Sequence, residues 1–386
     1  MDIKSKCLLV FVLCLIFMAC PAYASAAETD AEAIAADLDF SGVESFINSL
    51  NNDLVDDFNL QSIWQDAKNG RLDLSWQKIF NALWHRLWHE VTESAALLVQ
   101  LVVLAVASLL LVNFQEMFPK SSIAIIARAV VYLVLMTIAL QSFLLVGDMV
   151  KNTVDNMSGF VYALLPTLLT LMVAMGGVSS VGIFHPALLG AIGINVNIIK
   201  VAVVPLAYFS AALVVVSYIT PKFDLSKMAK LCQNMAVGII TLMLTLFTAF
   251  LGILGLTGAA IDGLTIKAAK SATGLFVPLV GKPLADAFDT VLSTALLIKN
   301  SVGVVGILVI LIICALPIIK ILVIAVIYRL AAALVQPLGD GALAEALHGL
   351  SNSLLVFFAV VAGLGLFFFF MLSITVGISD ISMMMR

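Results

Sequence analysis

Residues 303 to 330 read GVVGILVILIICALPIIKILVIAVIYRL, and this stretch decides the fold class of the chain. It contains only two charged residues, Lys320 and Arg329. Because about 20 consecutive apolar residues cross the core of a bilayer as a helix, the stretch predicts a membrane span. The whole chain has the same character, since 62% of its 386 residues are hydrophobic and 11% are charged, against roughly 25% charged in soluble domains. An all-α integral membrane protein is therefore expected.

Further apolar stretches predict a polytopic protein, and they lie near residues 95–113, 123–146, 159–178, 186–219, 234–257 and 353–378. The run 186–219 is too long for one ordinary span and short for two. It contains Lys200 and Pro205, so we expect a broken or re-entrant segment. Counting it as one crossing gives about seven spans. The loop holding Lys267 is then cytoplasmic and Lys222 lies outside, whereas two crossings would exchange these sides.

The N-terminus has the pattern of a secretory signal peptide, with Lys4 and Lys6 before an apolar run that ends in small residues. Cleavage is expected after Ala24. A lipoprotein signal with Cys20 as the modified residue is one alternative, and an uncleaved anchor is another. In each case the chain from residue 25 onward starts outside the cytoplasm.

Residues 25–94 form an acidic, amphipathic region, in which 13 of the 24 acidic residues of the chain fall. Its surplus of acid makes nucleic acid an unsuitable partner. Trp84 and Trp88 precede the first apolar stretch, where indoles prefer the headgroup zone, and they predict an interfacial collar. His85 and His89 have a spacing that can chelate a metal, but no third ligand is evident nearby, so we interpret them as interfacial and expect no metal.

The sequence offers no residues for common enzyme chemistry. It has no phosphate-binding GxxxxGK[ST] loop, no HExxH helix and no GxSxG elbow. Cys232 and Cys314 lie far apart and give no disulfide or zinc spacing. We therefore expect neither an enzyme nor a bound cofactor.

Lys200 and Lys320 lie inside apolar stretches, where ionisable side chains are costly and usually face a protein interior or an aqueous cavity. They are candidates for a polar pathway, although a lysine near a helix end can also extend to the interface. Arg329 lies near a span end and is interpreted as an anchor. Gly252 and Gly303 belong to glycine patterns that favour close helix packing.

A polar insert, residues 258–302, separates two apolar groups and contains VPLVGKPLADAFDT at 277–290. Pro283 is suited to the first turn of a helix, on which Lys282, Asp286 and Asp289 share one stripe. The insert is expected to form an amphipathic helical hairpin. It either lies at the membrane surface, which we favour, or dips inward so that its carboxylates line a polar passage.

Three stretches together resemble the stage III sporulation protein AE family of endospore-forming bacteria. They are GRLDLSWQKIF at 70–80, ALLPTLLTLMVAMGGVSSVGIFHPAL at 163–188 and TGLFVPLVGKPLADAFDTVLSTALLIKNSVGVVGIL at 273–308. The residues transferred as members of the family signature are Gly281, Pro283, Asp286, Asp289, Lys299 and Asn300. No catalytic residue comes with the resemblance.

The resemblance implies a multi-pass protein of the mother-cell membrane around the forespore. There it implies membership of a channel or secretion-like apparatus, with a cytoplasmic ATPase, ring-forming membrane proteins and a forespore protein as partners, required for late forespore gene expression. The hypothesis is a platform or permease-like component of that apparatus. A free-standing secondary transporter of a small solute and a scaffold without a conduit are the alternatives.

The expected organisation has five parts. They are a signal peptide (1–24), the acidic extracytoplasmic region (25–94), a first group of membrane helices (95–257), the polar insert (258–302) and a C-terminal group of membrane helices (303–386).

Overall fold

A computed structural model describes residues 41–49, 61, 64–65, 76–117, 122–175, 177–219, 225–276, 281–338 and 341–384, with the backbone alone over 258–295. All regular elements in these ranges are helices, which confirms the all-α class. The signal peptide and most of the acidic region lie outside the described residues. One short helix of that region, α3 (Ser41–Ser49), packs on the bundle through Phe46, whose ring centroid lies 5.7 Å from that of Phe160.

The bundle consists of long helices joined by short connections. In chain order they are α6 (Trp76–Met117), α7 (Ser122–Ala174), α8 (Val178–Ile198), the π-helix η1 (Ile199–Val203), α9 (Val204–Ile219), α10 (Ser226–Phe276), α11 (Gly281–Val335), the 3₁₀ turn η2 (Gln336–Leu338) and α12 (Gly341–Met384). At 1.5 Å per residue, α6, α7, α10, α11 and α12 are each roughly two to three times as long as a bilayer core is thick.

Proline and glycine account for where the long helices end. Proline disfavours helical backbone in the residue before it, and glycine lowers helix stability. The breakers lie at or next to the connections and are Pro119, Gly176 with Gly177, Pro221, Pro278, and Pro337 with Gly339. The positions of these residues in the sequence therefore indicate where the long helices end.

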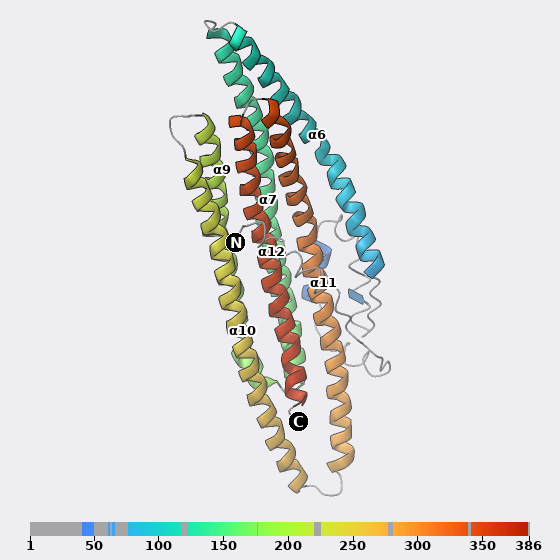
Figure 1. Cartoon of the computed structure of the whole chain (residues 1–386). Coiled ribbons are helices and arrows are strands. Elements are labelled where there is room, and N and C mark those ends of the chain that lie inside the picture. Colours follow the sequence, from blue (N-terminus) through green and yellow to red (C-terminus); the bar gives the residue numbers. More distant parts are fainter. Residues whose placement is uncertain are drawn as a thin grey trace.

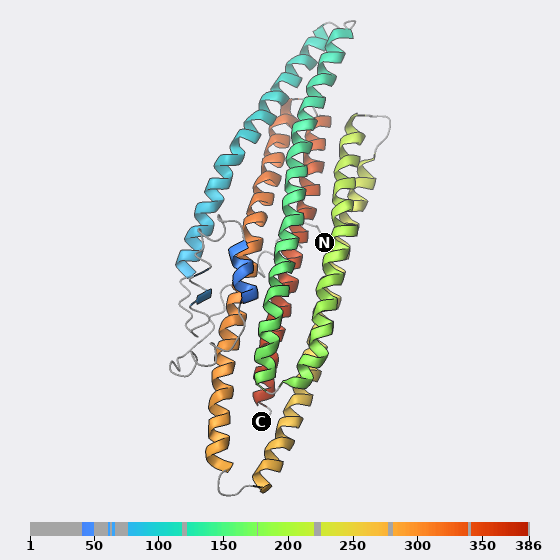
Figure 2. The same ribbon diagram turned by 180° about the vertical axis from the view of Figure 1, so that it is seen from behind.

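The rods alternate in direction, so the bundle has two distinct ends (Figures 1 and 2). At the first, here called the Trp76 end because α6 runs away from it, α7 meets α8, α10 meets α11 and α12 finishes, whereas Trp76 itself lies about midway along the bundle. At the other, the Gly341 end, α6 meets α7, α9 meets α10 and α11 meets α12. The α10–α11 hairpin projects beyond the Trp76 end, and the α6–α7 hairpin projects beyond the Gly341 end.

Five helical segments among the described residues are long and apolar enough to cross a membrane. They are Tyr132–Ala174, Val178–Ser217, Ser226–Gly255, Ile298–Val335 and Leu343–Gly377. The predicted stretch 95–113 lies on α6 and is not one of these five segments.

The predicted spans 123–146 and 159–178 lie together on helix α7, which is unbroken from Ser122 to Ala174. The residues between the two stretches are polar, but they include no proline and only Gly147, so nothing in them stops the helix. Because α7 is one continuous helix, the polar insert lies at the end of the bundle from which α6 runs away. The side of the membrane that the insert faces stays a prediction.

The run 186–219, expected to be broken or re-entrant, is an α-helix interrupted by a π-helical turn, and it does not re-enter. It continues from α8 through the π-helix η1 into α9, with Pro186 inside α8. Pro205 lies just past η1, and the wider π-helical turn relieves the clash that a proline ring makes with the preceding turn of a helix. Lys200 lies within that turn.

The polar insert forms the end of α10 and the beginning of α11, and it continues along the axes of these two helices. Its first part completes α10 up to Phe276, and its second part opens α11 at Gly281. Both continue in line with the apolar segments of the same helices, so the hairpin does not lie flat across the bundle (Figures 1 and 2).

Helix α12 lies at the centre and packs against α7, α9, α10 and α11. Its Phe357 ring lies 5.0 Å from the ring of Phe143 on α7 and 5.5 Å from that of Tyr208 on α9. Ser353, also on α12, bonds with Ser210 at 2.9 Å and accepts from Gln233 at 3.1 Å. Aromatic packing and buried hydroxyl bonds thus hold the helices together.

Candidate functional site

Lys200 forms an ion pair with Asp155, which projects from the middle of α7. The ammonium comes from the π-helical turn η1, so the pair joins two helices that are both candidate membrane spans. Neither partner is buried, with 38% of the Lys200 side chain and 55% of the Asp155 side chain exposed. The predicted intramembrane lysine therefore has a partner and still faces the outside of this chain.

Asp148 and Lys151 extend this exposed surface, and Tyr208 lies beside them with its hydroxyl buried. We call Asp148, Lys151, Asp155, Lys200 and Tyr208 the polar belt. Lys151 pairs with Asp148 at 3.2 Å, and its Nζ lies 4.9 Å from the centre of the Tyr208 ring. Charged groups at membrane depth are costly against lipid and usually face protein or water. The belt lies on two candidate spans, and an aqueous passage or another protein would suit its charges better than lipid.

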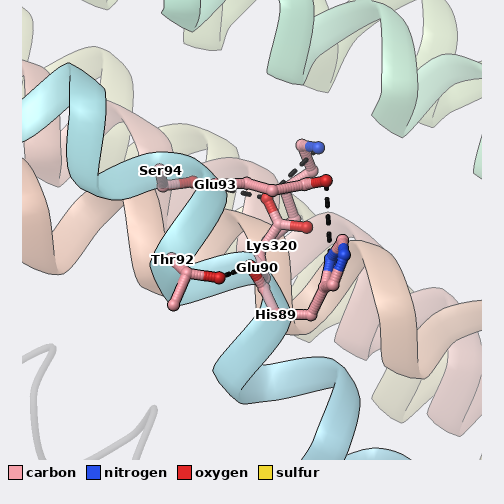
Figure 3. Close-up of polar contacts among 6 residues, drawn as sticks. All are labelled: His89, Glu90, Thr92, Glu93, Ser94 and Lys320. Atoms are coloured by element: carbon pink, nitrogen blue, oxygen red, sulfur yellow. Dashed lines mark hydrogen bonds and ion pairs between the residues drawn. The ribbon is translucent and has the colours of Figure 1, made fainter.

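Lys320 pairs with a different partner, Glu90 of α6, at 3.2 Å (Figure 3). Only 6% of the Glu90 side chain is exposed, compared with 43% for Lys320. Ser94 donates a further hydrogen bond to the Glu90 carboxylate at 3.4 Å. This contact fastens α6 to α11.

His89 faces Glu93 one turn along α6, with 3.4 Å between Nδ1 and the carboxylate oxygen (Figure 3). Trp84 and Trp88, on the same helix, are about half exposed. Nothing in the structure tests the interfacial collar, which stays a prediction.

Two signature residues lie where α11 meets α12. Lys299 is completely buried, and its ammonium donates a 2.6 Å hydrogen bond to the backbone carbonyl of Val376. The side-chain oxygen of the adjacent Asn300 is buried and has no hydrogen-bond partner in the described part of the chain. A Cβ atom on Gly303 would overlap Val376, so the two helices approach closely here.

The other signature residues, Gly281, Pro283, Asp286 and Asp289, lie with Lys282 in the first turns of α11, where only the backbone is described. They belong to the hairpin that projects from the Trp76 end. Asp289 and Lys320 are 31 residues apart on one helix, which separates them by roughly 45 Å. The candidate pathway residues are therefore not gathered into one cluster.

Sequence reasoning missed Asp155 and Glu90, the two acidic partners. The segment around Asp155 was interpreted as a connection between two spans, so its charges were not weighed as intramembrane groups. The signal was present in the spacing of Asp148, Lys151 and Asp155, which puts them on one face of a continuous helix. Glu90 had no such local signal, because its partner is far away in the sequence.

The comparisons with known proteins fit this architecture. The sequence model of the family described as "Stage III sporulation protein AE" matches residues 58–379. The chain is also 35% identical over 367 residues to "Stage III sporulation protein AE" of Bacillus subtilis (strain 168), covering 94% of this chain and 92% of that protein. This chain belongs to the stage III sporulation protein AE family. No solved structure matches it.

Membership makes this chain a sporulation protein, and its apolar helices make it a membrane protein. The family is one of membrane proteins of sporulation and is not a known class of enzymes. The resemblance noted in the signature stretches is thereby confirmed over most of the chain.

Proposed function

We propose that this protein is the membrane-embedded platform, or permease-like part, of a channel or secretion-like apparatus. The apparatus would join the mother cell to the forespore and support late forespore gene expression. Its partners would be other stage III sporulation proteins, including an ATPase and ring-forming components, and a forespore protein. The multi-pass chain would reside in the mother-cell membrane around the forespore.

The polar belt is the observation that carries this proposal. It places both members of the Asp155–Lys200 pair on the exposed face of candidate spans. In a chain surrounded only by lipid, these charged groups would be in contact with the acyl chains, which is unfavourable. A conduit or a protein neighbour along this face removes that cost.

The direction of the helices supports a separate role for each end of the bundle. With the N-terminal region outside the cytoplasm, the Trp76 end faces the space between the two membranes. The hairpin bearing Lys282, Asp286 and Asp289 then projects into that space, where it would dock ring-forming or forespore partners. The Gly341 end faces the mother-cell cytoplasm, on the side of the ATPase.

Deletion of the gene in its native spore-former tests the function. Shrunken forespores and a silent reporter of late forespore transcription after engulfment are expected. Normal spores would reject the intercellular role and favour the solute transporter. A pull-down under sporulation conditions that recovered no sibling sporulation protein would argue against the platform.

Cysteine labelling tests the orientation separately. A cysteine at Lys267, near the end of α10, should react with a membrane-impermeant thiol reagent added from outside. A cysteine at Lys227, in the first turn of the same helix, should react only after the cells are opened. The reverse pattern would invert the chain and withdraw the proposed roles of the two ends.

A further inference from the structure

A cavity of about 540 Å³ opens at the Gly341 end, away from the polar belt and from the polar insert. Helices α9, α10, α11 and α12 all contribute to its wall. The polar side chains that line it are Ser226, Lys230, Gln233, Arg329, Gln336, Glu345, His348 and Asn352. Apolar and polar groups both line the cavity, and its charged side chains suit a ligand that carries a charge.

Arg329 is the central cation of this cavity. Its Nη2 donates to the Asn352 side-chain oxygen at 3.3 Å, which fixes the direction of the guanidinium. Its Nε is buried and has no hydrogen-bond partner among the described residues. The guanidinium of Arg329 lines the cavity, and an anionic oxygen there would accept charge-assisted hydrogen bonds from it.

Lys230 supplies a second positive charge from α10, and its side chain is exposed. Glu345 contributes one carboxylate, so two cations and one acid leave a single net positive charge when His348 is neutral. The first residues of α10 and α12, Ser226 and Gly341, also line the cavity, and helix N-termini favour anions. The balance suits an anion that carries one negative charge.

The cavity lies at the ends of three candidate spans. Ser226 opens one span, Arg329 comes within the last two turns of the one that ends at Val335, and Glu345 is in the first turn of the third. Span ends lie at the level of lipid headgroups, and basic pockets between membrane helices bind headgroup phosphates.

We propose that this cavity binds a phosphate-bearing anion with one negative charge, and that a phospholipid headgroup supplies it. Arg329 donates to the phosphate oxygens, and Lys230 faces them from the rim. The four helices that form the wall are then joined by one ligand. The inference stands apart from the proposed function, because it concerns a different site and needs no conduit.

Thermal unfolding of the full chain, purified in detergent, tests this proposal. Short-chain phosphatidylglycerol should raise the unfolding temperature in a saturable manner, and short-chain diacylglycerol, which lacks the phosphate, should not. Inorganic phosphate and glycerol 3-phosphate form the second arm. Stabilisation by the phospholipid alone identifies a headgroup site, whereas equal stabilisation by the soluble phosphates identifies a soluble phosphate ligand.

Three variants connect the binding to the cavity. Arg329→Gln should weaken the apparent affinity for phosphatidylglycerol by about tenfold or more, as expected for a charge-assisted bond. Lys230→Gln should weaken it several-fold, and as an exposed residue it should leave folding intact. Lys227→Gln is the matched control, because Lys227 is exposed on the same helix but does not line the cavity. Absence of stabilisation by any phosphate compound, or equal affinity in Lys230→Gln and Lys227→Gln, would overturn the proposal.

Discussion

Two ion pairs that join helices in the described part of the chain differ in their surroundings. Lys320 meets a carboxylate, Glu90, of which only 6% is exposed, and the pair closes the contact between α6 and α11. Lys200 meets Asp155, of which 55% is exposed, on an open face of the bundle. Both lysines are equally conspicuous in the sequence, as single cations in apolar runs.

This difference teaches that a lysine within an apolar stretch can be structural or functional, and that its partner decides which. A buried acid becomes an uncompensated charge when its lysine is removed, so the closed pair matters for folding. An exposed pair contributes little to stability. The four charged residues of the polar belt lie on an exposed face of candidate spans. We therefore infer that they have a role other than helix packing.

The largest effect on stability is expected from breaking the ion pair between Lys320 and Glu90. Lys320→Met leaves the Glu90 carboxylate buried without its cation and should lower the free energy of unfolding by about 3 kcal/mol. Thermal unfolding in detergent measures this. The double variant Glu90→Leu with Lys320→Met should recover most of the loss, and a double variant no more stable than the single one would show that the pair is not structural.

A smaller effect is expected at the other closed contact, where α11 meets α12 beside Lys299. Gly303→Ala places a Cβ against Val376 and should cost about 1 to 2 kcal/mol of stability. Gly252→Ala is the control, since no atom lies within 4 Å of its added Cβ. It should be neutral or slightly stabilising, because alanine favours helix. Equal unfolding temperatures for the two variants would remove the evidence for close packing at Gly303.

The smallest effect on stability is expected from removing the exposed ion pair between Lys200 and Asp155. Lys200→Met should change the free energy of unfolding by less than about 1 kcal/mol. It should nevertheless silence the late forespore reporter, because the polar belt loses a cation. The exchange Asp155→Lys with Lys200→Asp keeps the net charge and should restore part of the signal. Full reporter activity in Lys200→Met would make this pair dispensable.

Much of the fold could be predicted from the sequence, because apolar length and helix breakers are local signals. The helix ends that precede Pro119, Pro221 and Pro278 in the sequence could be predicted in this way. The continuity of α7 was missed, since a polar segment between two apolar ones has the same composition as a loop.

The candidate site was less predictable, for a physical reason. Lys200 and Lys320 stand out alone, but the roles proposed for them depend on Asp155, 45 residues away from Lys200, and on Glu90 in another helix. The burial of Lys299 likewise depends on Val376. Such pairings follow from how the helices pack, which the pattern of one sequence does not specify.

Water access to the polar belt is the most direct test of the claim that this face serves a passage or a partner. Asn152 is exposed on α7 beside Asp148 and Asp155, and Leu242 is exposed within the apolar span of α10. A cysteine at Asn152 should react with a hydrophilic thiol reagent in sporulating cells or be shielded by a sibling protein whose removal restores labelling. A cysteine at Leu242 should stay unlabelled in lipid throughout. If Asn152→Cys were as unreactive as Leu242→Cys with and without the sibling proteins, the polar belt would face lipid, and the claim would fail.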